Sequence, residues 1–261
     1  MMTNVRPAYE YAITALVHRL KRALTTDHDD LKEVLQDPSH EVLHAALKNV
    51  ALAEEHLLQV LKRHDLPSTF LNAVGRHKLS ENPRVCMATL AHPAVSPTLV
   101  KKLLSRLHLF ELLNLCYLPG QSADLRMAAE LAIIQRLPMA PLGNRITLAR
   151  RATATILEAL FKEGHPQVIE AGLNNPKLQE VALFQHLNSS NATAETISQI
   201  ARHPRWSQRP NLRRAILKNR LTPRVWFIHF LPRLPRTEAR NLLHSQSLTM
   251  RQKQWIRDVI E

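Results

Sequence analysis

The sequence predicts an all-α fold, specifically an α-solenoid of about five three-helix repeats of ~42 residues with a helical cap at each end. Three observations predict it. Apolar residues recur at helical spacing, an apolar anchor residue returns about every 42 residues, and only five glycines occur among 261 residues. Tight hairpins and phosphate-binding loops depend on glycine at positive φ, so helix is the structure that this composition favours.

Five apolar anchor residues define the repeats. They are separated by 43, 40, 43 and 44 residues, and they are Val42, Val85, Leu125, Val168 and Leu212. Seven residues after the anchor, four of the repeats carry asparagine or histidine: Asn49, His92, Asn175 and Asn219. The third repeat has Ala132 at this position, so we expect its helix to continue through Leu137.

The chain is predicted to form a single domain, residues 1–261, with the repeats at 37–246. Residues 1–36 would form the N-terminal cap, in which Ile13 and Val17 lie on one side of an amphipathic helix. Residues 247–261 would form the C-terminal cap helix. Such caps shield the apolar faces of the terminal repeats.

The first helix of a repeat is expected to begin at a polar residue followed by proline, as at Asp37–Pro38, Asn82–Pro83 and His165–Pro166. The polar side chain accepts hydrogen bonds from the first turn, and proline is tolerated there because its missing N–H needs no partner. The helix is expected to end at the Asn or His that lies seven residues after the anchor, with asparagine in a left-handed conformation.

The second helix of a repeat carries a buried pair, fifteen and nineteen residues after the anchor, on one helix face. The pairs are Leu57 with Leu61, Val100 with Leu104, Leu183 with Leu187, and Phe227 with Leu231. A third apolar segment completes each repeat, and these segments are 68–77, 108–118, 153–163, 193–203 and 236–246.

Three short helices in about 42 residues resemble the armadillo and HEAT superfamily. The segment Asn219–Pro223, with Asp37–Pro38 ahead of Val42, is also similar to the variant leucine-rich repeats of bacteria. The resemblance covers roughly residues 28–246 and implies a concave face that binds proteins or peptides and, in a minority of members, nucleic acid. An iron–sulfur cluster needs clustered cysteines, which this chain lacks, so that property is not expected here.

The chain carries no segment typical of export or membrane insertion. Only Cys86 and Cys116 are present, and their spacing fits neither a disulfide framework nor a zinc or redox pair. We therefore expect a cytoplasmic protein in a reducing environment, without membrane insertion.

No catalytic motif is visible, so we expect no enzymatic activity, no cofactor and no metal. His40 and His44 are four residues apart on one predicted helix, but no third ligand has a matching spacing. Trp255 and Asp258 lie one helical turn apart and resemble, by analogy alone, the site of HEAT-like DNA glycosylases. This activity is the weakest of the alternatives, because Asp258 has no evident partner.

Positive charge is concentrated near the C-terminus. Residues 1–200 hold 21 Lys and Arg against 19 Asp and Glu, whereas residues 201–261 hold 14 against 3, so +11 of the net +13 lies there. All three tryptophans lie in the same region. Arginine supplies planar donors for carboxylate or phosphate, and tryptophan supplies a face for stacking. The candidate binding residues, here called the basic cluster, are Arg205, Trp206, Arg209, Arg213, Arg214, Lys218, Arg220, Arg224 and Trp226.

Two functions fit the basic cluster. The first is a non-enzymatic scaffold or adaptor that binds an acidic protein or peptide partner. The alternative is DNA or RNA binding through the same Arg/Trp surface. A structural reading also stays open, because arginine stems often cover apolar surface and tryptophan often packs between repeats.

Overall fold

The computed structural model describes residues 6–260, and the side chains of residues 13–260. It is all-helical, with nineteen α-helices, three 3₁₀-helices and no strand in the described range. The predicted all-α class is therefore confirmed. The chain divides into two compact units, residues 1–132 and 133–261, which are described separately. The division falls inside helix α9 (Ala123–Arg136).

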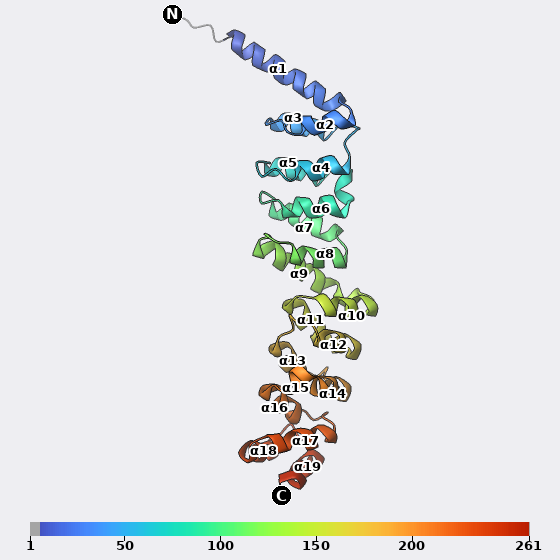
Figure 1. The fold of residues 1–261 in the computed structure, drawn as a ribbon, viewed down its shortest axis with the longest axis vertical. Helices are drawn as coiled ribbons and strands as arrows, with labels where there is room; N and C mark the ends of the chain where they lie inside the picture. The colour runs from blue at the N-terminus through green and yellow to red at the C-terminus, as the bar shows by residue number, and fades with distance from the viewer. Residues whose placement is uncertain (1–5, 261) are drawn as a thin grey trace, which may run out of the picture. The chain divides into compact units, whose positions relative to one another are not determined.

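The helices of the first unit stack in two rows. Helix α2 packs on α4 and α4 on α6, while α1 packs on α3 and α3 on α5 (Figure 1). The helices before α9 are α1 (Arg6–Thr25), α2 (His28–Val34), α3 (His40–Ala46), α4 (Glu54–Val60), α5 (Ser68–Val74), η1 (Lys78–Glu81), α6 (Pro83–Ala91), α7 (Pro97–Arg106) and α8 (Leu109–Tyr117).

The second unit repeats this arrangement. Helices α10, α12 and α14 pack on one another in one row, and α11, α13 and α16 do so in the other (Figure 1). The helices after α9 are η2 (Leu137–Met139), α10 (Leu142–Arg151), α11 (Ala154–Glu163), α12 (Pro166–Leu173), α13 (Glu180–Leu187), α14 (Ala194–Arg202), α15 (Pro204–Ser207), α16 (Pro210–Lys218), α17 (Arg224–Phe230), η3 (Leu231–Arg233), α18 (Arg236–Leu243) and α19 (Met250–Ile260).

The predicted apolar stripes form the core of each unit. Seven of the eight residues predicted as buried pairs are buried, and only Val100 is half-buried. On α7 its place in the core is taken by Leu99 and Leu103. The segment after Leu125, which lacks the recurring Asn or His, also behaves as expected, because α9 runs unbroken to Arg136 and continues into η2.

The asparagine seven residues after the anchor forms hydrogen bonds with the end of a preceding helix and so connects successive helix layers. In the first unit, the Asn49 amide donates to the carbonyl oxygens of Ala23 and Thr26, at 2.9 and 3.0 Å. In the second, the Asn175 amide donates to those of Ala149 and Ala152, at 2.9 and 3.1 Å. Both asparagines are buried, so each satisfies carbonyl groups that a helix end leaves without an intrahelical partner.

His92 and Asn219 bridge layers in the same manner, since His92 Nε2 lies 2.7 Å from the carbonyl oxygen of Arg63 and the Asn219 amide donates to that of Leu187 at 2.6 Å. The prediction that asparagine adopts a left-handed backbone conformation at the helix end is wrong. Asn219 has φ −86° and ψ 129°, and no described residue other than glycine has positive φ. Its Oδ1 accepts the N–H of Leu221 at 2.8 Å, so an Asx turn closes the helix without that conformation.

The sequence separation between neighbouring layers is smaller than the predicted period of about 42 residues. The bridging bonds of Asn49 span 26 and 23 residues, and those of Asn219 and His92 span 32 and 29. Anchors Val168 and Leu212 accordingly lie on α12 and α16, which belong to different rows. A division into five three-helix repeats is therefore not confirmed by these contacts.

The polar residues before proline behave unequally at the helix starts. Asn82 Oδ1 accepts the N–H of Arg84 at 2.8 Å and so caps α6 as predicted. Asp37 lies outside α3, whose N-cap residue is Ser39, and the His165 side chain makes no capping bond. At the N-terminus, α1 packs on α2 and α3 but leaves Ile13 and Val17 exposed.

Candidate partner-binding surface

The nine residues of the basic cluster all lie in the second unit, on three consecutive helices and their connections. Arg205 and Trp206 are on α15, Arg209 precedes α16, and Arg220 lies in the turn after α16. Helix α16 carries Arg213, Arg214 and Lys218, and α17 carries Arg224 and Trp226.

Trp206 is a packing residue in the structure. Its side chain is 2% exposed, and its indole N–H donates to the carbonyl oxygen of Leu173 at 2.9 Å. The Arg205 guanidinium lies 4.2 Å from the centre of the indole ring and donates to the carbonyl oxygens of Asn175 and Leu178 at 3.4 and 3.3 Å. These contacts hold α15 against α12 and its following turn, so the indole face is not available to a partner.

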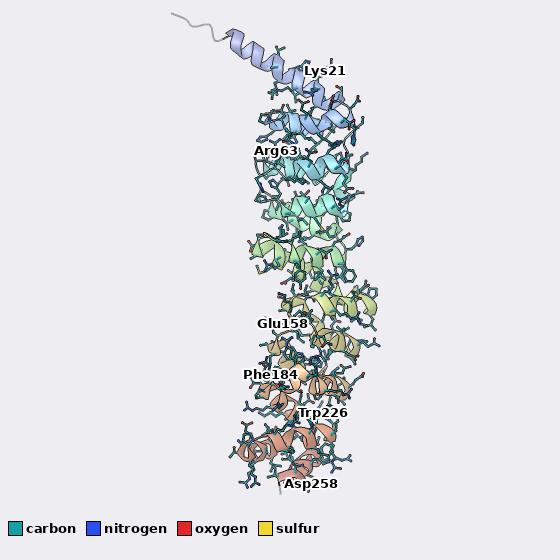
Figure 2. The ribbon with its side chains drawn as sticks, in the orientation of Figure 1. Lys21, Arg63, Glu158, Phe184, Trp226 and Asp258 are labelled. Carbon is teal, nitrogen blue, oxygen red and sulfur yellow. The ribbon has the colours of Figure 1, made fainter. Side chains whose placement is uncertain are left out.

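Trp226, labelled in Figure 2, is half-buried and also internally engaged. Its indole N–H donates to Ser198 Oγ at 2.9 Å, and its ring stacks on Phe230 with the centres 5.8 Å apart. Arg213 lies over the same Phe230, 6.0 Å from the ring centre, and its Nε donates to the carbonyl oxygen of Ser207 at 2.6 Å. Arg213 therefore joins α16 to its neighbours.

Arg214 is neutralised by a carboxylate. Its Nε and one terminal nitrogen donate to Glu238 at 2.9 and 2.8 Å, a bidentate pair between α16 and α18. These hydrogen bonds lower the pKa of Glu238 and raise that of Arg214 relative to their ordinary values. Arg214, Glu238 and Lys218 also line a shallow pocket of about 170 Å³.

Six of the seven cations in the basic cluster have no carboxylate within 4.0 Å among the described residues. Arg205 and Arg213 instead contact backbone carbonyl oxygens and aromatic rings, which leaves four cations without such contacts. The side chains of Arg209, Lys218, Arg220 and Arg224 are exposed, and none lies within 4.0 Å of a carboxylate among the described residues. We call these four the free cationic residues. No Asp or Glu occurs anywhere between residues 196 and 237, so their field is not cancelled by neighbours in sequence.

Exposed aliphatic residues adjoin the free cationic residues and were missed by the sequence analysis. Val225 and Ile228 are 58% and 53% exposed, on the side of α17 opposite the buried Phe227 and Phe230. The signal that identifies them is their i, i+3 spacing on the polar side of the helix, where a purely solvated face would carry polar residues.

A cluster of possible metal ligands lies in the first unit, on residues that sequence spacing did not connect. The ligand atoms of His28, Glu55 and His56 lie within 4.8 Å of one another, whereas His40 and His44 belong to no such group in the described range. His56 is fully buried, its Nδ1 accepts the N–H of Ala53 at 3.0 Å, and its Nε2 has no hydrogen-bond partner.

The tautomer of His56 opposes metal binding. Burial, together with the charge of His28, lowers the pKa of His56, so its ring is neutral at pH 7. Since Nδ1 accepts a hydrogen bond, the proton of the neutral ring is on Nε2. A metal bound at Nε2 would need the opposite tautomer, and this would break the capping bond with Ala53.

The other candidate reactive residues lack an activating environment. Burial raises the pKa of the Cys86 thiol to about 11 and that of Cys116 to about 11, so neither is a thiolate at neutral pH. Trp255 packs edge-on against Phe227 at 5.6 Å. Asp258 is exposed and accepts a hydrogen bond from Gln254 at 2.9 Å. These two residues therefore do not outline a base-binding pocket.

Comparisons with protein-family models, with curated proteins and with solved structures found no match to this chain. Among the described residues, no helix has both the length and the apolar character needed to cross a membrane. The function is therefore inferred from the charge and the exposed side chains of the second unit.

Proposed function

We propose that this protein is a non-enzymatic helical-repeat scaffold, of the armadillo and HEAT kind, that binds an acidic protein partner through the free cationic residues. The layered packing of short helices supports the repeat architecture, although its layers are shorter than the predicted three-helix repeats. A cytoplasmic location stays a prediction.

The observation that carries the proposal is that none of the side chains of Arg209, Lys218, Arg220 and Arg224 lies within 4.0 Å of a carboxylate among the described residues. Elsewhere in the chain, Arg19 and Arg63 are paired with Asp37 and Asp65, and residues 1–200 as a whole hold 21 Lys and Arg against 19 Asp and Glu, a net charge of only +2. An unpaired group of cations raises the local concentration of an acidic partner and the rate of its association.

The tryptophans favour a protein over a nucleic acid. Single-stranded DNA and RNA are commonly held by bases that stack on exposed aromatic rings. Trp206 is buried, and Trp226 is stacked on Phe230 with its N–H bonded to Ser198. The exposed apolar side chains beside the cations, Val225 and Ile228, are aliphatic instead, and aliphatic side chains suit contacts with another protein.

A charge-reversal variant tests the proposal. The triple variant Arg209→Glu, Arg220→Glu and Arg224→Glu is measured by fluorescence anisotropy against a glutamate-rich peptide and against mixed-sequence single-stranded DNA and RNA. We expect the affinity for the peptide to fall at least about tenfold, because the attraction between the three arginines and the glutamates of the peptide becomes repulsion between carboxylates. The helical circular dichroism should be unchanged, since all three side chains are exposed.

The control variant reverses three exposed cations of the first unit, Arg76, Lys101 and Lys102, and makes the same change in net charge. It should keep the affinity of the wild type for the peptide. Equal losses in both variants would show that binding depends on net charge alone and would overturn the proposal. Stronger binding of DNA or RNA, with a log–log salt slope of about −0.7 per neutralised phosphate, would establish the alternative function.

A further inference from the structure

Helix α17 presents a mixed apolar and cationic face to solvent. Its inner side is fixed in the core by Phe227 and Phe230, so Arg224, Val225 and Ile228 are turned outward. In a helix, Val225 and Ile228 are neighbours at i and i+3, and Arg224 and Ile228 are neighbours at i and i+4. Leu221, in the turn before α17, is a further exposed apolar residue, and it follows Arg220 directly.

The positions 44 residues earlier in the chain provide an internal comparison. Val181 and Phe184 on α13 lie 44 residues before Val225 and Ile228, and they are 53% and 46% exposed. The residue that corresponds to Arg224 is Glu180, and no Lys or Arg occurs between residues 178 and 201. Helix α13 thus has the apolar part of this face without its positive charge.

Contacts with neighbouring helices hold α17 in place, so its outer face is preorganised for binding. The side chain of Trp226 ties α17 to α14 through Ser198, and Phe227 packs against Trp255 of α19. Binding to a rigid helix orders few side chains of the protein itself, which reduces the entropic cost of association. The helix of seven residues is about 10 Å long, which matches roughly two turns of a partner helix.

We propose that the outer face of α17, with Arg220 and Arg224, binds an amphipathic helix of the acidic partner. The aliphatic side chains of that helix would contact Val225 and Ile228, while its carboxylates would pair with Arg220 and Arg224. This inference rests on the proposed function, and it names the partner class more narrowly. A phosphate backbone carries no aliphatic groups that would pack against Val225 and Ile228, so nucleic acid would leave this part of the face exposed.

Two peptides of equal charge separate the apolar from the ionic contribution. Each has about 20 residues, long enough for appreciable helix. The first places leucines at helical i, i+4 and i+7 spacing with glutamates beside them, and the second has serine in place of every leucine. Affinities for the full-length protein are measured by fluorescence anisotropy, with phosphatidylserine vesicles and single-stranded RNA as further probes.

Paired serine substitutions then locate the contact. The variant Val225→Ser and Ile228→Ser should lower the affinity for the leucine peptide by about tenfold or more, because the apolar area of two side chains is no longer buried. The control variant Val181→Ser and Phe184→Ser removes a similar exposed apolar area from α13 and should leave that affinity unchanged. Both variants alter half-exposed side chains, so circular dichroism should match the wild type.

The outcomes distinguish this inference from the function on which it rests. If Arg220→Glu with Arg224→Glu abolishes binding of both peptides, but the serine variant of α17 binds the leucine peptide normally, the acidic partner stands and the amphipathic helix is wrong. If the charge reversal changes neither affinity, the proposed function itself fails. Tighter binding of vesicles or RNA than of the leucine peptide would also overturn the inference.

Discussion

Buried histidines show at the residue scale how chemistry and packing are coupled in this protein. His186 is buried, with Nδ1 3.0 Å from the carbonyl oxygen of Phe161 and Nε2 3.0 Å from Thr196 Oγ1. A carbonyl only accepts, so Nδ1 carries the proton and Nε2 accepts from the Thr196 hydroxyl. Burial lowers the pKa of His186, which keeps the ring neutral and both bonds intact.

The stability of the second unit should therefore depend on pH. As the pH falls below 6.5, the ordinary value, His186 gains a proton in the unfolded chain before it does so in the folded one. The free energy of unfolding should decrease from about pH 7 to pH 5, and the decrease should be shallower in His186→Gln. Urea denaturation at several pH values measures this, and identical slopes for both proteins would contradict it.

His203 adds to the same pH trend in the second unit, and His56 and His77 produce the same trend in the first, because burial also lowers the pKa of each. Their contribution means that His186→Gln should reduce the dependence rather than remove it. Sequence alone reveals none of these shifts, because each depends on how deeply the packing of other helices buries the imidazole ring.

Close approach between helices is decided at the scale of the element. Helix α12 contains Gly172, and a Cβ there would lie 2.6 Å from Cε2 of Phe161 on α11. Phe161 is fully buried and has little room to move. Gly143 on α10 has nothing within 4 Å of the same virtual atom, although it also lies in a helix.

The two glycines should respond in opposite directions to alanine. Gly172→Ala should destabilise the protein by about 1–3 kcal/mol, because overpacking outweighs the better helix propensity of alanine. Gly143→Ala should instead stabilise it by up to about 1 kcal/mol. Chemical denaturation followed by circular dichroism gives both values. A stabilising Gly172→Ala would show that α11 and α12 separate more easily than their packing indicates.

At the scale of the whole molecule, the contacts within each of the two units mostly connect neighbouring helices. The hydrogen bonds of the bridging asparagines also connect neighbouring helices, and those of Asn175 join the end of α12 to the end of α10. In such arrays, stability is close to a sum of local and nearest-neighbour terms. A defect in one layer should therefore loosen adjacent layers and leave distant ones unchanged.

Hydrogen exchange measured by mass spectrometry tests this locality. Asn175→Ala leaves two buried carbonyl groups without a partner, so amides of α10, α12 and α13 should exchange faster, while those of α3 to α8 keep the rates of the wild type. The control is Asn188→Ala, because Asn188 is exposed and bonds only the carbonyl oxygen of Phe184 in its own helix. Uniformly faster exchange along the chain would indicate global rather than local coupling.

The sequence predicted the helices well because each helix encodes its own start, stripe and end. The pairs Leu183 with Leu187 and Phe227 with Leu231 are buried as their spacing indicates. The candidate surface was predicted less well. Arg214 and Arg224 have the same residue type on consecutive helices, yet Arg214 pairs with Glu238 and Arg224 does not pair with any carboxylate in the described range.

Periodicity and composition are local properties of the sequence, so they were sufficient to predict the all-helical class, the buried stripes and the concentration of charge in residues 201–261. The tertiary structure alone decided which helices stack and which side chains face solvent. Neighbouring layers lie 23 to 33 residues apart rather than about 42, so their contacts are set by packing between rows. The same packing buried Trp206 and exposed Val225 and Ile228, because the rotation of each helix against its neighbours is not encoded in any single repeat.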